Sequence, residues 1–146
     1  MAQALAEASA AGVRGEVPVG AVVVRDGVLL GRAGNASIAL SDPTAHAEVL
    51  ALRAAGEAAG NYRLPGSTLY VTIEPCLMCM GAAIHARIAR LVFGCADPKG
   101  GAAGSLFDLS ADARLNHRIV VAPGVEEAAC RDIVQRFFRA RRAAAT

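Results

Sequence analysis

Apolar positions change their spacing along the chain, and each spacing predicts a type of element. Residues 17–35 read VPVGAVVVRDGVLLGRAGN, which places two apolar runs on either side of Asp26-Gly27. This dipeptide between two apolar runs is a strong hairpin signal, because both residues tolerate the positive φ that a two-residue turn requires. The pattern predicts two antiparallel strands.

A helical period follows the predicted hairpin. Residues 41–61 place apolar side chains three and four positions apart, which predicts an amphipathic helix. Ser41 or Asp42 is expected as its N-cap, with Pro43 in the first turn and the end near Gly60-Asn61.

The next three segments predict a strand, a helix and a strand. Residues 67–74 form a β-rich run that ends at Pro75, residues 76–88 have helical spacing, and residues 89–95 return to strand composition. Such a unit normally joins parallel neighbours through a right-handed crossover.

The remaining segments complete a layered domain. Residues 1–12 predict a helix, residues 96–105 a Gly-rich loop, residues 117–124 a short last strand and residues 125–146 a closing helix. We therefore expect residues 1–146 to fold as a single α/β domain, with helices on a mixed central sheet in an α/β/α arrangement.

Composition and charge narrow the class of protein without naming a partner. The chain is 54% hydrophobic and 19% charged, which is an ordinary globular composition rather than a disordered one. The net charge of +2 permits a nucleic-acid partner but does not argue for one.

The N-terminal residues do not predict export. Residues 1–12 lack a basic region, and Glu7 interrupts the apolar stretch that a signal peptide needs. No window of about 18 residues is apolar and free of charge, so no membrane span is expected. We expect a cytoplasmic location, where paired cysteines more often bind metal or take part in catalysis than form a disulfide.

Two short motifs, thirty positions apart, offer the parts of a metal site. Cys76 and Cys79 share one face of a helix that follows Pro75, and its first turn stabilises thiolates. His46 and Glu48 are about 200° apart around a helix, so they serve one site only at the helix N-terminus. The spacing predicts two helix N-termini aimed at one metal, with His46, Cys76 and Cys79 as ligands.

The number of ligands bears on whether such a site is structural or catalytic. Either motif alone also fits a structural half-site, a redox pair or chance. A structural zinc needs four protein ligands, whereas a catalytic zinc keeps one position for water. Packing or surface roles are expected for the other candidates, which are His85, Cys95, His117 and Cys130. Three ligands and the free carboxylate of Glu48 favour a catalytic site.

At these residues the sequence resembles the zinc-dependent nucleoside and nucleobase deaminases, which share the H-x-E and P-C-x-x-C motifs. The closer resemblance is to the bacterial tRNA-specific adenosine deaminases, which convert adenosine to inosine at the wobble position of an anticodon. The matching segments, in order over nearly the whole chain, are EVPVGAVVV, DPTAHAEVLALR, NYRL, TLYVTIEPCLMCMGAAIHARI, GAAGSL, NHR and FFRARR.

This resemblance implies a fold, a cofactor and a reaction. The fold is the three-layer cytidine-deaminase-like sandwich, in a homodimer with one zinc ion per subunit held by His46, Cys76 and Cys79. The reaction is hydrolytic deamination by a zinc-activated hydroxide, with Glu48 carrying protons between water, base and leaving amine. The expected partner is a tRNA anticodon loop.

The resemblance also implies substrate contacts outside the two motifs. One is an Asn after the second strand that contacts the base or its ribose, and others come from the backbone beside the ligands. On the resemblance, residues of the Gly-rich loop and arginines of the last helix are candidates for RNA contact, whereas without it a solvated helix end is the preferred explanation of the arginines. The positions are Asn35, Ala47, Pro75, Asp97, Lys99, Arg139, Arg141 and Arg142.

Two other functions remain open at this point. A deaminase of a free nucleobase or nucleoside, such as guanine or cytosine, would share the zinc motif and the fold. A zinc-stabilised RNA-binding module without turnover is the alternative from another class, and the free carboxylate of Glu48 argues against it.

Overall fold

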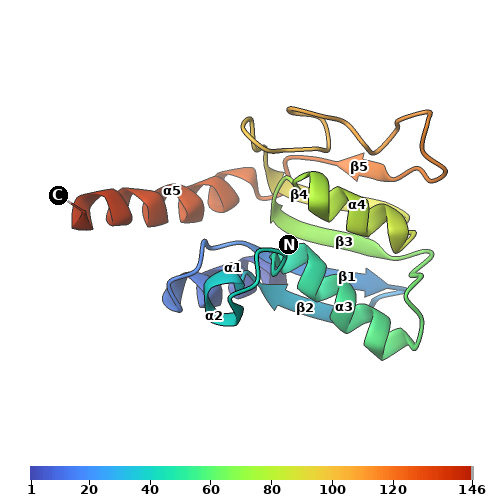
Figure 1. Ribbon diagram of the computed structural model, residues 1–146, viewed down its shortest axis with the longest axis horizontal. Coiled ribbons are helices and arrows are strands. Elements are labelled where there is room, and N and C mark those ends of the chain that lie inside the picture. The colour runs from blue at the N-terminus through green and yellow to red at the C-terminus, as the bar shows by residue number, and fades with distance from the viewer. Residues whose placement is uncertain (146) are drawn as a thin grey trace.

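A five-stranded mixed sheet with the strand order β2-β1-β3-β4-β5 forms the centre of the computed structural model, which describes residues 1–145 (Figure 1). The strands are β1 (Gly20–Arg25), β2 (Val28–Gly34), β3 (Thr68–Ile73), β4 (Arg90–Cys95) and β5 (Val120–Ala122). β1 pairs antiparallel with β2 and β3, whereas β3, β4 and β5 are parallel neighbours. The predicted mixed sheet is confirmed, and so is the parallel pair around the second motif.

The predicted hairpin is confirmed at its turn. Asp26 and Gly27 both have positive φ angles, of 51° and 74°, and β1 and β2 continue on either side of them. Positive φ at both central residues matches the right-handed twist of the strands, which is why this dipeptide closes the hairpin.

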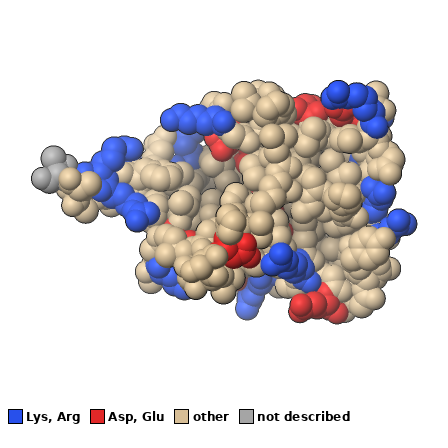
Figure 2. Space-filling view, viewed as in Figure 1, with Lys and Arg blue, Asp and Glu red and all other residues tan. Residues whose placement is uncertain are grey.

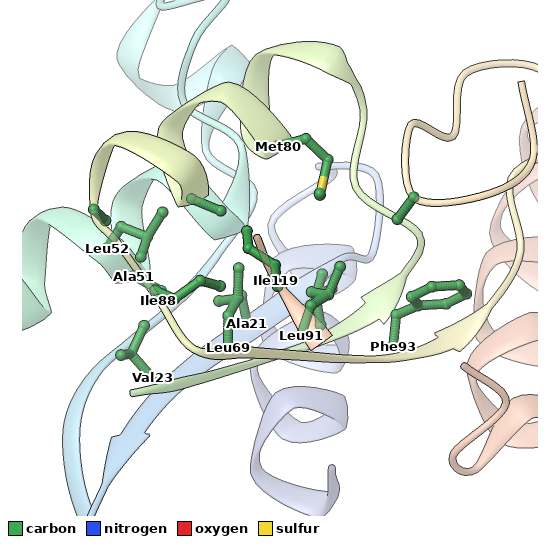
Figure 3. Packing of buried hydrophobic residues seen from close by; sticks show 14 of the residues in the cluster. Ala21, Val23, Ala51, Leu52, Leu69, Met80, Ile88, Leu91, Phe93 and Ile119 are labelled. Carbon is green, nitrogen blue, oxygen red and sulfur yellow. The ribbon is translucent and has the colours of Figure 1, made fainter. Parts of the chain in front are cut away.

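Helices cover both faces of the sheet, as the predicted α/β/α arrangement requires. They are α1 (Ala2–Val13), α2 (Ser37–Leu40), α3 (Ala47–Ala59), α4 (Leu77–His85) and α5 (Glu127–Ala144). α3 and α4 pack together on one face, while α1 lies on the other face and contacts the beginning of α5 (Figures 1 and 3).

Glycines in the hairpin allow helices to approach the sheet closely on both sides. A Cβ at Gly20 would lie 2.0 Å from the carbonyl oxygen of Ala4 in α1, and one at Gly31 would lie 2.4 Å from that of Ala51 in α3. Both distances are far below van der Waals contact. The hairpin is therefore held between α1 and α3 with no room for a side chain at these two positions.

The hydrophobic core lies between the sheet and the pair of helices α3 and α4 (Figure 3). Leu69 of β3 and Leu91 of β4 are neighbours in the parallel register, and both are fully buried. Met80 of α4 is fully buried and packs onto this layer. Burial of these side chains holds the N-terminus of α4 at the end of β3.

The helix predicted over residues 41–61 begins later than expected. Neither Ser41 nor Asp42 is its N-cap and Pro43 is not in its first turn, because α3 begins at Ala47 with His46 as N-cap. Ser41 has a left-handed φ of 50°, and the carboxylate of Asp42 accepts hydrogen bonds from the backbone N–H and the hydroxyl of Thr44. These contacts make residues 41–46 a turn, and the short helix α2 before them was not predicted.

The ends of the other helices agree with expectation or differ by a few residues. α3 ends where predicted, since Gly60 adopts the left-handed conformation of a C-cap. α4 ends at His85, before the predicted position 88, because Arg87 has a φ of 58° that no helix continues.

α5 extends beyond the ends of the strands (Figure 1). Its only fully buried residue is Cys130, near its start, and Lys or Arg side chains gather along its far end (Figure 2). Among residues 1–145, no helix combines the length and the apolar character needed to cross a membrane.

Candidate metal centre and cavity

The N-terminus of α3 carries one half of the candidate metal centre. His46 is the N-cap residue with extended backbone angles, and Glu48 follows in the first turn. The backbone N–H of Ala47 donates to the side-chain oxygen of Asn35 at 2.8 Å. Asn35 therefore satisfies one of the free N–H groups at the start of α3, which fixes the position of both motif residues.

The N-terminus of α4 carries the other half. Cys76 is the N-cap of α4, and Cys79 lies in the first turn with its side chain fully buried. His46 Nδ1 lies 3.7 Å from Cys76 Sγ and 3.5 Å from Cys79 Sγ, and the three ligand atoms lie within 4.8 Å of one another. The two helix N-termini thus meet at one cluster that offers two sulfurs and one imidazole nitrogen to a metal.

The electrostatics of the cluster favour one thiolate even without an ion. Hydrogen bonds from Cys79 and then from His46 lower the pKa of Cys76 to about 3. The hydrogen bond with Cys76, followed by burial, raises the pKa of Cys79, and the hydrogen bond with Cys76 raises that of His46. The Cys76 sulfur is therefore negatively charged at neutral pH and is ready to bind a cation.

Glu48 lies beside the cluster as a buried carboxyl group. Glu48 is only 3% exposed, and burial raises the pKa of its carboxyl group to about 7. A carboxyl group with this pKa exchanges protons readily at neutral pH. The arrangement supplies a metal site and a proton carrier next to each other.

A cavity of about 820 Å³ opens over these groups. The structure brings together in its lining most of the residues singled out from the sequence, namely Asn35, His46, Glu48, Cys76, Asp97, Lys99, Arg139 and Arg142. Three other predicted residues, Ala47, Pro75 and Cys79, are buried beneath the lining. The N–H of Ala47 is bonded to Asn35, and the carbonyl of Pro75 accepts the N–H of Ala102.

The outer wall of the cavity is formed by α5. Val134, Gln135 and Phe138 line it together with two of the predicted arginines. Phe138 is 41% exposed and its ring meets that of Phe137 edge to face. The guanidinium of Arg141 lies over the Phe137 ring and outside the cavity lining. This wall combines positive charge with an accessible aromatic ring. Neither Phe137 nor Phe138 belongs to the hydrophobic core.

Sequence reasoning missed Glu74, which also lines the cavity. Its carboxylate is buried and accepts hydrogen bonds from the loop that follows β4. Burial alone would raise the pKa of Glu74, but the hydrogen bonds from Ser105, Asp97 and Ala103 outweigh it, so the pKa is lowered. The sequence did carry a signal for Glu74, because this acidic residue follows a mostly apolar strand and stands immediately before a proline.

The other histidines and cysteines lie away from the candidate metal centre. Within residues 1–145, His46, Cys76 and Cys79 are the only cluster of possible ligands. Cys95 and Cys130 are buried free thiols, and His85 is exposed. His117 Nε2 donates to the carbonyl of Ile88 at 2.7 Å, so this part of the NHR segment fastens the loop before β5 to the turn after α4.

Comparison with known proteins agrees with this geometry. The family of MafB19-like deaminases matches residues 1–142. The tRNA-specific adenosine deaminase of Haemophilus influenzae is 50% identical over 143 residues, which cover 97% of this chain and 83% of that protein.

Solved structures show the same likeness. A structure from studies of A-to-I editing by tRNA:A34 deaminases at the wobble position of transfer RNA has a TM-score of 0.88 and 48% identity, covering 91% of this chain and 96% of that one. Guanine deaminase from Bacillus subtilis has a TM-score of 0.62 and 37% identity, covering 65% of this chain and 61% of that one. Because the full-length likeness, the cytidine-deaminase-like fold and the His-Cys-Cys cluster agree, the chain belongs to the family of bacterial tRNA-specific adenosine deaminases.

Proposed function

We propose that this protein is a zinc-dependent hydrolase that converts adenosine to inosine at the wobble position of a tRNA anticodon. The observation that carries the proposal is the position of Glu48. This buried carboxyl group lies beside three metal-ligating side chains, in a cavity whose outer wall is basic and aromatic. Full-length likeness to tRNA-specific adenosine deaminases supports the substrate.

The cluster of His46, Cys76 and Cys79 fits zinc in its donor atoms and in its dimensions. Zinc binds thiolate sulfur at about 2.3 Å and imidazole nitrogen at about 2.1 Å in a tetrahedral arrangement, which places sulfur and nitrogen about 3.6 Å apart. The nitrogen of His46 lies 3.5 Å and 3.7 Å from the two sulfurs. Three protein ligands would leave the metal open to water, as a catalytic zinc site requires.

When bound, zinc supplies Lewis-acid activation of a water molecule at neutral pH. Glu48 would accept a proton from the attacking water and deliver it to N1 of the adenine. The same carboxyl group would then take the remaining proton of the hydroxyl group on C6 and pass it to the departing amino group, which leaves as ammonia while C6 becomes a carbonyl. Its pKa of about 7 suits both steps, because the group must accept and donate a proton in each cycle.

Asn35 holds this machinery in place and lines the cavity. Its side-chain oxygen is already bonded to the N–H of Ala47, which leaves its amide NH₂ free to donate to the base or its ribose. The structure therefore supports a double role for Asn35, in fixing α3 and in orienting the substrate.

RNA recognition is the reason to prefer a tRNA to a free base. Lys99 and Arg139 are exposed cations in the cavity lining, where phosphates can reach them. Asp97 lines the same cavity. Phe138 offers an exposed ring on which an unpaired base can stack. Unpaired anticodon bases can be turned out of their loop at low cost, as a deaminase pocket requires.

Deamination of a free base such as guanine or cytosine is the second candidate. The similarity to guanine deaminase favours it, but that likeness covers 65% of this chain, against 91% for the structure associated with tRNA editing. A zinc-stabilised binding module without turnover is the weakest candidate, because it has no use for a buried carboxyl group with a pKa of about 7.

We also propose that the protein acts as a homodimer in the cytoplasm. The four cysteines are free, which suits a reducing compartment. Tyr62 and Leu77 are large exposed hydrophobic residues on the side of the molecule that carries α3 and α4, where a second subunit can bury them. Sedimentation of the purified protein would give the number of subunits.

The decisive experiment offers the zinc-loaded protein a choice of substrates. The unmodified tRNA with adenosine at the wobble position, free adenosine, guanine and cytosine are incubated separately, and inosine and ammonia are measured. Inosine in the tRNA with no reaction of the free compounds is expected. Turnover of a free base with the tRNA unchanged would keep the zinc chemistry and overturn the substrate, and no turnover of any compound would favour the binding module.

A further inference from the structure

The carboxylate of Glu74 is the centre of a network that joins β3 to the loop over residues 97–105. Glu74 is 2% exposed. The N–H of Asp97 donates to it at 3.0 Å, that of Ala103 at 3.1 Å and that of Ser105 at 2.9 Å, and the hydroxyl of Ser105 donates as well. One carboxylate thus accepts hydrogen bonds from both ends of the loop.

Backbone contacts bring the same loop against the segment that presents a metal ligand. The N–H of Ala102 donates to the carbonyl of Pro75 at 2.8 Å, and Gly101 forms a β-bridge with Cys76. A Cβ at Gly101 would lie 2.3 Å from the carboxyl carbon of Glu74. The loop therefore packs directly onto residues 74–76, and Gly101 makes the approach possible.

This network determines where two of the expected RNA contacts lie. Asp97 is bonded to Glu74 through its backbone, and its carboxylate accepts the N–H of Lys99 at 3.0 Å. Both side chains line the cavity over Glu48. The oxygens of Glu74 are occupied by protein donors, so its effect on a substrate is exerted through the loop.

We propose that Glu74 is a positioning residue that holds the loop over residues 97–105 against the end of β3, so that Asp97 and Lys99 face the bound RNA. The proposal rests on the function proposed above and extends it to a residue outside the two motifs. Loss of the network releases the loop, which weakens RNA binding while the metal and the proton carrier stay in place.

Replacement of Glu74 by glutamine tests this role with little change of shape. The new amide NH₂ points a donor at backbone N–H donors, so part of the network is lost. With an anticodon stem-loop RNA as substrate, Glu74→Gln is expected to raise KM about tenfold and to change kcat less than about threefold. Metal content is expected to stay at one zinc per chain, and hydrogen exchange is expected to accelerate at the amides of Asp97, Ala103 and Ser105.

A double-mutant cycle with Lys99→Ala separates positioning from a general loss of stability. If Glu74 acts by placing Lys99, the effect of Lys99→Ala on KM is smaller in the Glu74→Gln background than in the wild type. Asp112→Asn is the matched control, because this carboxylate also accepts backbone and side-chain donors, from Arg114, but does not line the cavity. It is expected to leave KM unchanged.

Ser105→Ala keeps the test open should Glu74→Gln fail to fold. It removes one donor from the network and is expected to raise KM about threefold, with the same loss of coupling to Lys99. An unchanged KM, or additive effects of the two substitutions, would overturn the proposal.

Failure of the proposed function has a different signature. The wild type then produces no inosine from the stem-loop RNA, and hydrogen exchange of the loop decides about Glu74. If hydrogen exchange at the amides of Asp97, Ala103 and Ser105 is the same in Glu74→Gln as in the wild type, the positioning role is overturned. Faster exchange in the variant shows that Glu74 holds the loop.

Discussion

Glu48 shows how a single side chain acquires its chemistry from its surroundings. On an exposed helix this carboxyl group would be ionised and ordinary. At the N-terminus of α3 it is buried beside two cysteine sulfurs and an imidazole, and burial raises its pKa to about 7. The residue type came from the sequence, whereas the protonation behaviour depends on packing.

Replacement of Glu48 by glutamine is expected to abolish turnover and to leave metal binding intact. Glutamine keeps the shape but cannot carry protons, so kcat for inosine formation should fall by roughly 10²–10⁴. Zinc content by elemental analysis should stay at one ion per chain, because Glu48 is outside the ligand cluster. Glu57→Gln, an exposed position on the same helix, is the control. Activity of Glu48→Gln within threefold of wild type would remove Glu48 from the mechanism.

The motif residues could be predicted from their spacing, because helix geometry limits where their side chains can meet. Two side chains about 200° apart on a helix serve one site only at its end, and His46 is indeed the N-cap of α3. The reason for the position of that end could not be predicted. Ser41 and Asp42 looked like suitable N-caps, but His46 is the N-cap, and Asn35 at the end of the hairpin accepts the N–H of Ala47.

α5 illustrates how one element combines a buried anchor with an exposed functional face. Near its start, Cys130 packs against Gly94 of β4 so closely that a Cβ at Gly94 would lie 2.3 Å from the Cys130 sulfur. Its later residues form the outer wall of the cavity. The sequence pattern predicted the helix and its basic end, whereas its position across the cavity depends on this contact with the sheet.

The stability contributed by this anchor is expected to depend on pH above 9. Burial raises the pKa of the Cys130 thiol from 9.0 to about 11. Between these values the unfolded chain loses the thiol proton and the folded chain keeps it, so the free energy of unfolding falls as pH rises. The loss assigned to this group is on the order of 2 kcal/mol across the window.

Urea unfolding of wild type and Cys130→Ala at pH 8, 9, 10 and 11 measures this effect. The two free energies of unfolding should approach one another as pH rises, because the variant lacks the titrating thiol. Groups that do not interact with Cys130 titrate alike in both proteins and cancel in the difference. A constant difference over the four pH values would contradict the assignment.

For the molecule as a whole, the metal centre is expected to act as a cross-link between α3 and α4. Its ligands come from two helix N-termini that are thirty positions apart along the chain. A metal that binds the folded cluster and not the unfolded chain stabilises the fold.

Removal of zinc by a chelator should therefore lower Tm, by about 10 °C for a stabilisation of a few kcal/mol in a chain of this size. Differential scanning calorimetry measures the change, and added zinc should restore Tm. Glu48→Gln should show the same fall in Tm when zinc is removed. Cys79→Ala should have a low Tm from the start, and the chelator should change it little. Identical curves with and without zinc would show that the metal serves the reaction alone.

Local patterns determined much of this protein by themselves. Strand and helix order and the turn at Asp26-Gly27 follow from interactions between residues close together in the chain, and the two motifs of the metal cluster are each visible as short local patterns. The relation to adenosine deaminases followed from the motifs and was confirmed over the full length.

Only the tertiary structure decided how distant segments complete the site. Asn35 accepts the first N–H of a helix that begins twelve positions later, Glu74 accepts donors from as far along as Ser105, and α5 lines the cavity together with the motif residues. These contacts depend on which elements the sheet places side by side. Hydrogen bonds between residues so far apart leave no periodic pattern in a single sequence, so the fold had to be known before their roles were visible.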